Sequence, residues 1–170
     1  LQKLPSFGKK MEVIFVEGGS QDGTYSVIKQ EISKYTGPFK CRLIKQRGRG
    51  KGDAVRLGFS RAENELLIIL DADLTVDPQE LPKFYRAFSR GLGDFVMGSR
   101  LIYPMQKLAM RNLNFLGNKF FSLAFSFLLD QKIKDTLCGT KAILKEDYLK
   151  MEKNRHFFGN FDPFGDFDLI

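Results

Sequence analysis

The segment Glu65–Pro78 reads ELLIILDADLTVDP and is the most informative part of the sequence about the fold. Five apolar residues, Leu66–Leu70, are followed directly by Asp71-Ala72-Asp73. A short apolar run between polar residues is typical of a strand that is buried on both faces, as in a parallel sheet covered by helices. Open sheets of this kind bind ligands at the carboxyl ends of their strands. The two carboxylates stand at such an end.

These two carboxylates are candidate ligands of a divalent cation. Residues two apart in an extended strand point to the same side, so alternation predicts that Asp71 and Asp73 lie together. Like charges at close range are unfavourable unless a cation joins them. Mg²⁺ and Mn²⁺ prefer such oxygen ligands, usually completed by the phosphates of a substrate. A strand followed by an acidic turn and a helix start at Asp77-Pro78 is the simpler alternative.

Length and composition predict one globular domain. The chain has 170 residues, of which 43% are hydrophobic and 28% are charged, and this is enough for a single core. The net charge of +7 favours phosphate-bearing partners. The two cysteines, Cys41 and Cys138, lack the spacing of metal ligands and are expected to be reduced. The sequence has no apolar run long enough to predict a membrane-spanning helix.

Strands and helices are expected to alternate along the chain. With helices between them, the first strands are expected near residues 12–16, 41–44, 66–70 and 94–98. Strand–helix–strand connections of this kind are parallel crossovers. Polar segments follow three of these strands, at Glu17–Thr24, Asp71–Asp73 and Ser99-Arg100. Their convergence at one edge of a sheet would be a stronger signal than any single motif.

The most basic segment, Lys45–Gly52 (KQRGRGKG), alternates glycine with positive charge. A loop of this composition offers exposed amides and cations to an anion, although a solvated surface loop is an equally good interpretation. A helix is expected to follow it at 53–62, and another at 78–89.

A Phe-rich segment, Asn114–Leu129, changes the pattern in the second half of the chain. It is too short to span a bilayer. It fits either a buried core helix or a helix that lies in a membrane interface and forms a wall for a lipid substrate. Basic residues that could meet lipid phosphates lie in or near it: Lys107, Arg111, Lys119, Lys132 and Lys134. A short strand at 141–144 and a helix at 146–151 are expected to follow.

Taken in order, several motifs resemble those of family 2 glycosyltransferases with the GT-A fold. Within that family the chain looks most like the polyprenyl/dolichyl-phosphate hexosyltransferases, such as dolichol-phosphate mannosyltransferase. The matching segments extend over nearly the whole chain: EGGSQDGT (17–24), GRGKGDAVRLG (48–58), LLIILDADLTVDP (66–78), FVMGSR (95–100), Arg111 with Asn114, DTLCGTKAI (135–143) and GDFDL (165–169).

The resemblance implies an α/β fold of the GT-A, Rossmann-like type, with a mostly parallel sheet flanked by helices. Relatives usually open with a strand that ends in a Pro-x-Tyr-Asn-Glu-like turn. Nothing before Glu12 matches that turn, so the first strand is expected to be missing. Residues 1–170 would then form a single catalytic domain that is truncated at both ends. A second departure is Glu17-Gly18, where the family usually has paired Asp residues.

The resemblance also implies roles for residues by their position. The metal ligands would be Asp71, Asp73 and Thr75. The nucleotide sugar would contact Val16, Glu17, Asp22, Lys51, Asp71, Ala72, Asp73 and Arg100. The candidate catalytic residues are Asp73, together with Asp166 and Asp168, which match the acidic motif near the acceptor.

These roles imply an enzyme that moves a hexose from UDP- or GDP-hexose, with Mg²⁺ or Mn²⁺ as cofactor and inversion at the sugar. The metal would stabilise the leaving diphosphate. A polyprenyl or dolichyl phosphate is the expected acceptor, and its oxygen is already anionic near neutral pH. A hydroxyl acceptor would instead need Asp166 or Asp168 as a base. The expected location is the cytoplasmic face of a membrane, either peripheral or anchored by segments outside this chain.

Three other interpretations stay open at this point. LLIILDADLT also fits a haloacid-dehalogenase-type phosphatase with Asp71 as nucleophile and Asp73 as acid and base, but that motif normally lies on the first strand of its domain. A nucleic-acid-binding domain could use Lys45–Lys51. The Phe residues are not interleaved with these charges as stacking platforms would be, so no nucleic acid is expected as a partner. A fragment that folds poorly alone is the third possibility.

Overall fold

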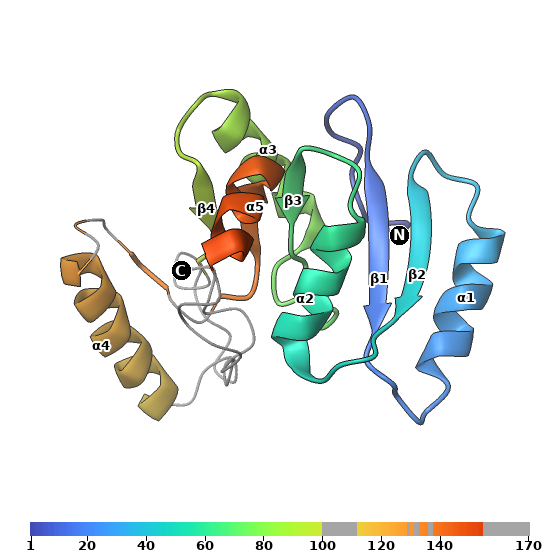
Figure 1. Ribbon diagram of the computed structural model, residues 1–170, viewed down its shortest axis with the longest axis horizontal. Helices are drawn as coiled ribbons and strands as arrows, with labels where there is room; N and C mark the ends of the chain where they lie inside the picture. Colours follow the sequence, from blue (N-terminus) through green and yellow to red (C-terminus); the bar gives the residue numbers. More distant parts are fainter. Residues whose placement is uncertain (100–111, 129, 131–132, 136–137, 155–170) are drawn as a thin grey trace.

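The computed structural model describes residues 1–99, 112–128, 130, 133–135 and 138–154. Within these residues, strands and helices alternate along the chain (Figure 1). The elements are β1 (Glu12–Glu17), α1 (Thr24–Lys34), β2 (Lys40–Lys45), α2 (Gly50–Arg61), β3 (Leu66–Ile68), the 3-10 helix η1 (Pro78–Glu80), α3 (Leu81–Ser89), β4 (Phe95–Met97), α4 (Asn112–Leu128), β5 (Lys141–Leu144) and α5 (Lys145–Asn154). The expected α/β class is confirmed.

The described strands form two hydrogen-bonded sheets. β1 and β2 pair in parallel, as the first strand–helix–strand unit predicts. The second sheet has the order β3-β5-β4, and β5 runs antiparallel to both of its neighbours. β3 and β4 therefore run in the same direction but are separated by β5. The sequence predicted a strand at β5 but not its position between two earlier strands.

Two sets of contacts show that β1, β2 and β3 run in the same direction. At the amino ends, the carboxylate of Glu12 on β1 accepts hydrogen bonds from the backbone N–H groups of Glu63 and Asn64, just before β3. At the carboxyl ends, Lys51 follows β2 and contacts Asp71, which follows β3. The arrowheads of β1 and β2 in Figure 1 point to this same edge. That the strand which usually opens this family is missing before Glu12 stays a prediction.

β3 is buried on both faces, as its apolar run predicts. On one face, Leu67 and Ile69 pack in a cluster with side chains from α2, β5 and α5: Phe59, Ile143 and Tyr148. On the other face, Leu66, Ile68 and Leu70 pack against a second cluster formed by Leu81, Phe84 and Ala142. Two packed faces fix the end of β3, and with it the turn that carries the two aspartates.

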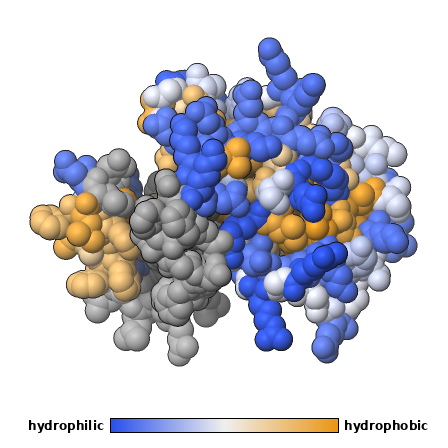
Figure 2. All heavy atoms as spheres, viewed as in Figure 1, coloured by the Kyte–Doolittle hydropathy of each residue, from blue (hydrophilic) through white to orange (hydrophobic). Residues whose placement is uncertain are grey.

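Two helices differ from what the sequence predicts. α2 begins at Gly50, three residues before the expected start at 53, so Lys51 lies in its first turn rather than in a loop. The Phe-rich helix α4 exposes most of its described apolar side chains: Phe120, Phe121, Leu123, Phe127 and Leu128 are at least half exposed. Figure 2 shows this apolar surface at one end of the molecule. The interpretation of α4 as a buried core helix is therefore wrong for these side chains.

None of the helices in the described ranges is long and apolar enough to cross a membrane.

Candidate functional site

The two aspartates lie in a tight turn after β3. The backbone N–H of Leu74 donates to the carbonyl oxygen of Asp71 at 3.0 Å, and Leu74 itself adopts a left-handed conformation with φ of 53°. Asp73 accepts hydrogen bonds from the N–H and the hydroxyl of Thr75, at 3.1 and 2.8 Å, through the same carboxylate oxygen. Because the chain has left the strand here, strand alternation does not determine where these side chains point. The prediction of an extended strand through Asp73 was wrong, and the prediction that the two carboxylates lie together stays a prediction.

Asp71 forms an ion pair with Lys51. The Lys51 ammonium lies 2.8 Å from one carboxylate oxygen and 3.1 Å from the other. A third residue, Gly139, lies against both groups. A Cβ atom built at Gly139 would overlap the Asp71 carboxylate and would lie 2.5 Å from the Lys51 nitrogen. Three segments that are far apart in the sequence thus meet at one point. Only a glycine at position 139 leaves room for the Asp71 and Lys51 side chains there.

The topology explains why these segments meet. β5 is antiparallel to β3 and β4, so the segment that leads into β5 lies at the carboxyl ends of both strands. Beyond the ladder, the N–H of Ile69 still donates to the carbonyl of Lys141 at 2.8 Å. Gly98, just after β4, donates its N–H to the carbonyl of Thr140 at 2.9 Å. The ends of β3 and β4 therefore meet at the start of β5.

The basic loop between β2 and α2 is held by Gln46, for which the sequence predicted no role. The side-chain amide of Gln46 donates to the carbonyl of Gly50 at 2.8 Å and to the carboxylate of Asp53 at 2.9 Å. A Cβ built at Gly18 would lie 3.1 Å from the carbonyl oxygen of the same amide. Gln46 thus connects the turn after β1 with the start of α2. No charge or spacing pattern could have identified it, because its role depends on contacts.

The turn after β1 holds a buried carboxylate. Glu17 is 4% exposed, and one of its carboxylate oxygens accepts from the backbone N–H of Ser20. Hydrogen bonds from Ser20 hold the pKa of Glu17 below its ordinary value, helped by the N–H of Gly19 and the charge of Lys45. The other carboxylate oxygen is buried and has no hydrogen-bond partner among the described residues. This oxygen can accept a hydrogen bond from a ligand.

Two further predicted contacts lie close to that turn. Asp22 accepts hydrogen bonds from the hydroxyl and the backbone N–H of Thr24, at 2.6 and 3.1 Å, and these lower the pKa of Asp22. This arrangement fixes the start of α1. Val16 is half-buried on β1, and a Cβ at Gly58 of α2 would lie 3.4 Å from it. Their contacts with a nucleotide stay predictions.

Three predicted site residues, Arg100, Asp166 and Asp168, lie outside the described residues. Of the other positions, Glu17, Lys51 and Asp71 are linked along one edge. The link runs from Glu17 and Gly18 through Gln46 to the start of α2, and then through Lys51 to the turn after β3. Of the three polar segments expected to converge, those after β1 and β3 are thus connected through the basic segment after β2, whereas Arg100 of the third lies outside the described residues.

The donor groups at this edge fit a divalent cation that also binds a substrate. Asp71 already has a cationic group, the Lys51 ammonium, against both of its oxygens. Asp73 lies two residues further along the same turn. In the described ranges, no three His, Cys, Asp or Glu side chains are grouped so that they could hold a metal by themselves. Carboxylate oxygens are the ligand type that Mg²⁺ and Mn²⁺ prefer, and these ions keep positions for water and phosphates.

Comparisons with known proteins identify the family. Residues 2–151 match the family model of glycosyl transferase family 2. Glycosyltransferase AglJ of Haloferax volcanii is 32% identical over 148 residues, which are 86% of this chain and 46% of the relative. The mouse (Mus musculus) dolichyl-phosphate beta-glucosyltransferase is 34% identical over 147 residues, covering 79% of this chain and 44% of the relative.

A third relative is the dolichol-phosphate mannosyltransferase of Saccharomyces cerevisiae, 29% identical over 141 residues, with 73% of this chain and 52% of the relative covered. The chain thus spans about half the length of the curated relatives it matches. All three are glycosyltransferases by name, so the phosphatase alternative gains no support. Because the matched region contains both the aspartate turn and the segments that meet it, the chain belongs to glycosyl transferase family 2.

Proposed function

We propose that this protein transfers a hexose from a nucleotide-diphosphate sugar to a polyprenyl or dolichyl phosphate, with inversion at the sugar carbon. The observation that carries the proposal is the meeting of Lys51, Asp71 and Gly139 at the carboxyl edge of the sheet, beside Asp73. This edge offers carboxylates for a metal ion and an ammonium for phosphates. Gly139 leaves room for the Asp71 and Lys51 side chains that carry these groups. Membership of the family supports the same activity.

Each residue has a distinct part in this proposal. Asp71 and Asp73, with Thr75, hold Mg²⁺ or Mn²⁺, which when bound neutralises charge on the leaving diphosphate. Lys51 and Arg100 add positive charge near the phosphates. The nucleoside lies toward β1, along Val16, Glu17, Asp22 and Ala72. One carboxylate oxygen of Glu17 has no hydrogen-bond partner among the described residues, which makes it a candidate acceptor for a hydrogen bond from this part of the donor.

The reaction needs little acid–base chemistry from the protein. An oxygen of the acceptor phosphate forms a bond to the anomeric carbon while the bond from that carbon to the donor diphosphate breaks. The nucleoside diphosphate leaves with the bonding electron pair. Because a phosphate monoester is largely deprotonated near neutral pH, no proton has to be removed from the attacking oxygen. For a hydroxyl acceptor, Asp166 or Asp168 would have to accept that proton.

We also propose that the protein acts at the cytoplasmic face of a membrane; its lipid acceptor and its contact with a membrane surface rest on two supports. Two of the relatives are named for dolichyl or dolichol phosphate. The described part of α4 presents apolar side chains on the surface, with Phe127 86% and Leu123 73% exposed. A helix of this kind can lie in the interface of a bilayer and bring a lipid phosphate to the sheet edge.

Binding of the donor is tested first, by calorimetry with UDP and GDP on the full-length protein in the presence and absence of Mn²⁺. We expect one nucleotide to bind only with the metal present, and Asp73→Asn to reduce this binding by at least tenfold. Asp77→Asn is the matched control. It removes a carboxylate from the same loop, while asparagine can still accept the hydrogen bond from the Gln79 N–H that Asp77 accepts at 2.9 Å.

The same preparations then test transfer, with a labelled sugar on that nucleotide and vesicles that contain polyprenyl phosphate. We expect the wild-type protein to produce a labelled lipid and the Asp73→Asn variant to produce none. Nucleotide binding without any metal dependence would contradict the proposed metal site. Transfer to a hydroxyl acceptor, with none to the lipid phosphate, would overturn the proposed acceptor.

A further inference from the structure

The Lys51 ammonium lies where a divalent cation would contact Asp71. It is 2.8 Å from one carboxylate oxygen and 3.1 Å from the other, so it engages both oxygens. The pair is only partly buried, with side-chain exposures of 37% for Lys51 and 29% for Asp71. Solvent can therefore reach the pair, and Lys51 can leave Asp71 without a buried charge being left behind.

The space around Asp71 does not let its carboxylate turn away freely. A Cβ at Gly139 would overlap the Asp71 carboxylate, which shows how closely the segment before β5 approaches it. A metal ion would have to use oxygens that the ammonium already contacts. Two cations on one carboxylate repel each other at this range. Metal and lysine are therefore alternatives at Asp71 rather than companions.

We propose that Lys51 is an exchangeable cation, which holds Asp71 in the metal-free protein and is displaced when Mg²⁺ or Mn²⁺ binds. A lysine suits this role because its charge is compact and its stem is flexible. When the donor is also bound, the displaced ammonium contacts its diphosphate. This inference rests on the proposed function for the identity of the anion, but the exchange at Asp71 does not depend on the nucleotide.

The exchange predicts opposite effects of one substitution. In Lys51→Met the metal no longer competes with an ammonium, so Mn²⁺ alone should bind about two- to fivefold more tightly, as expected for losing one partly exposed ion pair. In the presence of saturating Mn²⁺, the same variant should bind UDP or GDP more weakly, because the diphosphate loses a cation. A lysine that only shapes the loop would weaken both kinds of binding.

The first experiment titrates the full-length protein with Mn²⁺ at low salt and measures the free ion by electron paramagnetic resonance. The second measures the binding of UDP and GDP by calorimetry. Arg47→Met is the matched control, because it removes the same charge from the loop just before α2 while Lys51 remains against Asp71. The double variant Lys51→Met/Asp71→Asn should lose the gain in Mn²⁺ affinity. Thermal unfolding verifies that each variant is folded.

The outcomes separate the exchange from the proposed function. Three results would overturn the exchange. They are equal Mn²⁺ affinities of Lys51→Met and Arg47→Met, a lower Mn²⁺ affinity of Lys51→Met than of the wild type, and no Mn²⁺ binding by any variant. If Mn²⁺ binding tightens in Lys51→Met but neither nucleotide binds to the wild-type protein, the exchange at Asp71 stands and the proposed function fails.

Discussion

Gly98, the residue after β4, shows how little space the site leaves at the scale of single residues. A Cβ built there would lie 2.8 Å from the sulfur of Cys138 and 3.3 Å from the carbonyl oxygen of Thr140. Both of these residues are buried, at 1% and 2% exposure. We expect Gly98→Ala to lower the free energy of unfolding by about 1–3 kcal/mol, because a packed core resists added atoms. Urea denaturation measures this change.

Two further variants show whether the cause is steric. Cys138→Ala removes the sulfur that the new methyl group would meet, so Gly98→Ala should be less destabilising in that background than in the wild type. Gly117→Ala on α4 is the control, because a Cβ there meets nothing within 4 Å. It should leave the stability unchanged or raise it by up to about 1 kcal/mol. Equal losses in both backgrounds would contradict the steric explanation.

Site residues that belong to a sequence pattern could be predicted from the sequence. Site residues that are identified only by their contacts could not. Asp71 and Asp73 follow a strand signal, and Lys51 lies in a basic glycine segment, so each was found from the sequence. The ion pair between Lys51 and Asp71 was not, because nothing in a sequence shows which two loops meet. Gln46 and Gly139 were missed for the same reason.

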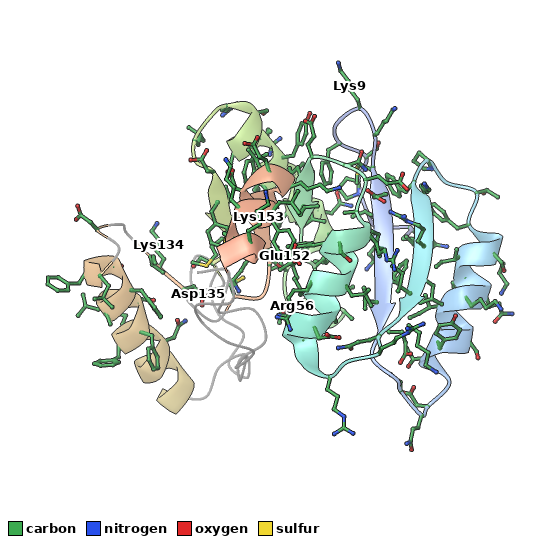
Figure 3. The ribbon with its side chains drawn as sticks, in the orientation of Figure 1. Lys9, Arg56, Lys134, Asp135, Glu152 and Lys153 are labelled. Atoms are coloured by element: carbon green, nitrogen blue, oxygen red, sulfur yellow. The ribbon has the colours of Figure 1, made fainter. Side chains whose placement is uncertain are left out.

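Helix α4 buries polar side chains and exposes apolar ones, which is the reverse of the usual pattern. Among the α4 side chains that the structure describes, the buried ones are polar: Asn118 is 1% exposed and Ser122 is 8% exposed. The Asn118 amide donates to the carboxylate of Asp135 at 2.8 Å, and Figure 3 shows Asp135 between α4 and the rest of the protein. Apolar side chains lie outside. Such a helix matches an apolar environment on its outer side, as a membrane interface provides.

The outer row of α4 should therefore determine binding to vesicles. Leu123 and Phe127 are four residues apart and lie on one face. We expect Leu123→Ser/Phe127→Ser to weaken binding to anionic vesicles by at least tenfold, since each buried apolar side chain contributes about 1.5–3 kcal/mol. Co-sedimentation with phosphatidylserine vesicles measures this. Val27→Ser on α1 is the control, because Val27 is also exposed, at 59%. Equal binding by all three proteins would contradict the proposed membrane contact.

At the scale of the whole molecule, local signals predicted the elements, and long-range contacts determined how they are arranged. The strands expected at 12–16, 41–44 and 141–144 agree with β1, β2 and β5 to within a residue at each end. The order β3-β5-β4 was not predicted, because strand pairing between distant segments leaves no periodic pattern. The early start of α2 at Gly50 was missed because glycines are poor helix formers. Contacts of Gln46 and Asp53 hold that turn instead.

The carboxylate of Glu12 helps to join the two sheets at the amino ends of β1, β2 and β3. It accepts hydrogen bonds from the backbone N–H groups of Glu63 and Asn64 at 2.6 and 3.1 Å and from the Asn64 amide at 3.0 Å, and it pairs with Arg42 of β2. Burial raises the pKa of Glu12, but these hydrogen bonds and the Arg42 charge outweigh burial and leave the pKa below its ordinary value. Ionised Glu12 thus links β1, β2 and the entry to β3.

This link should make stability depend on pH in a defined direction. Because the pKa of Glu12 is lower in the folded state than in the unfolded chain, its contribution is complete above pH 4.5, its ordinary pKa, and is lost as the pH falls through the folded value. We expect Glu12→Gln to lower the free energy of unfolding by about 1.5–3 kcal/mol at pH 7. In urea titrations, the difference from wild type should shrink toward pH 3. Glu31→Gln, whose carboxylate is 62% exposed on α1, should change little at either pH. A Glu12→Gln deficit that stays constant across this range would show that the link does not depend on the charge of Glu12.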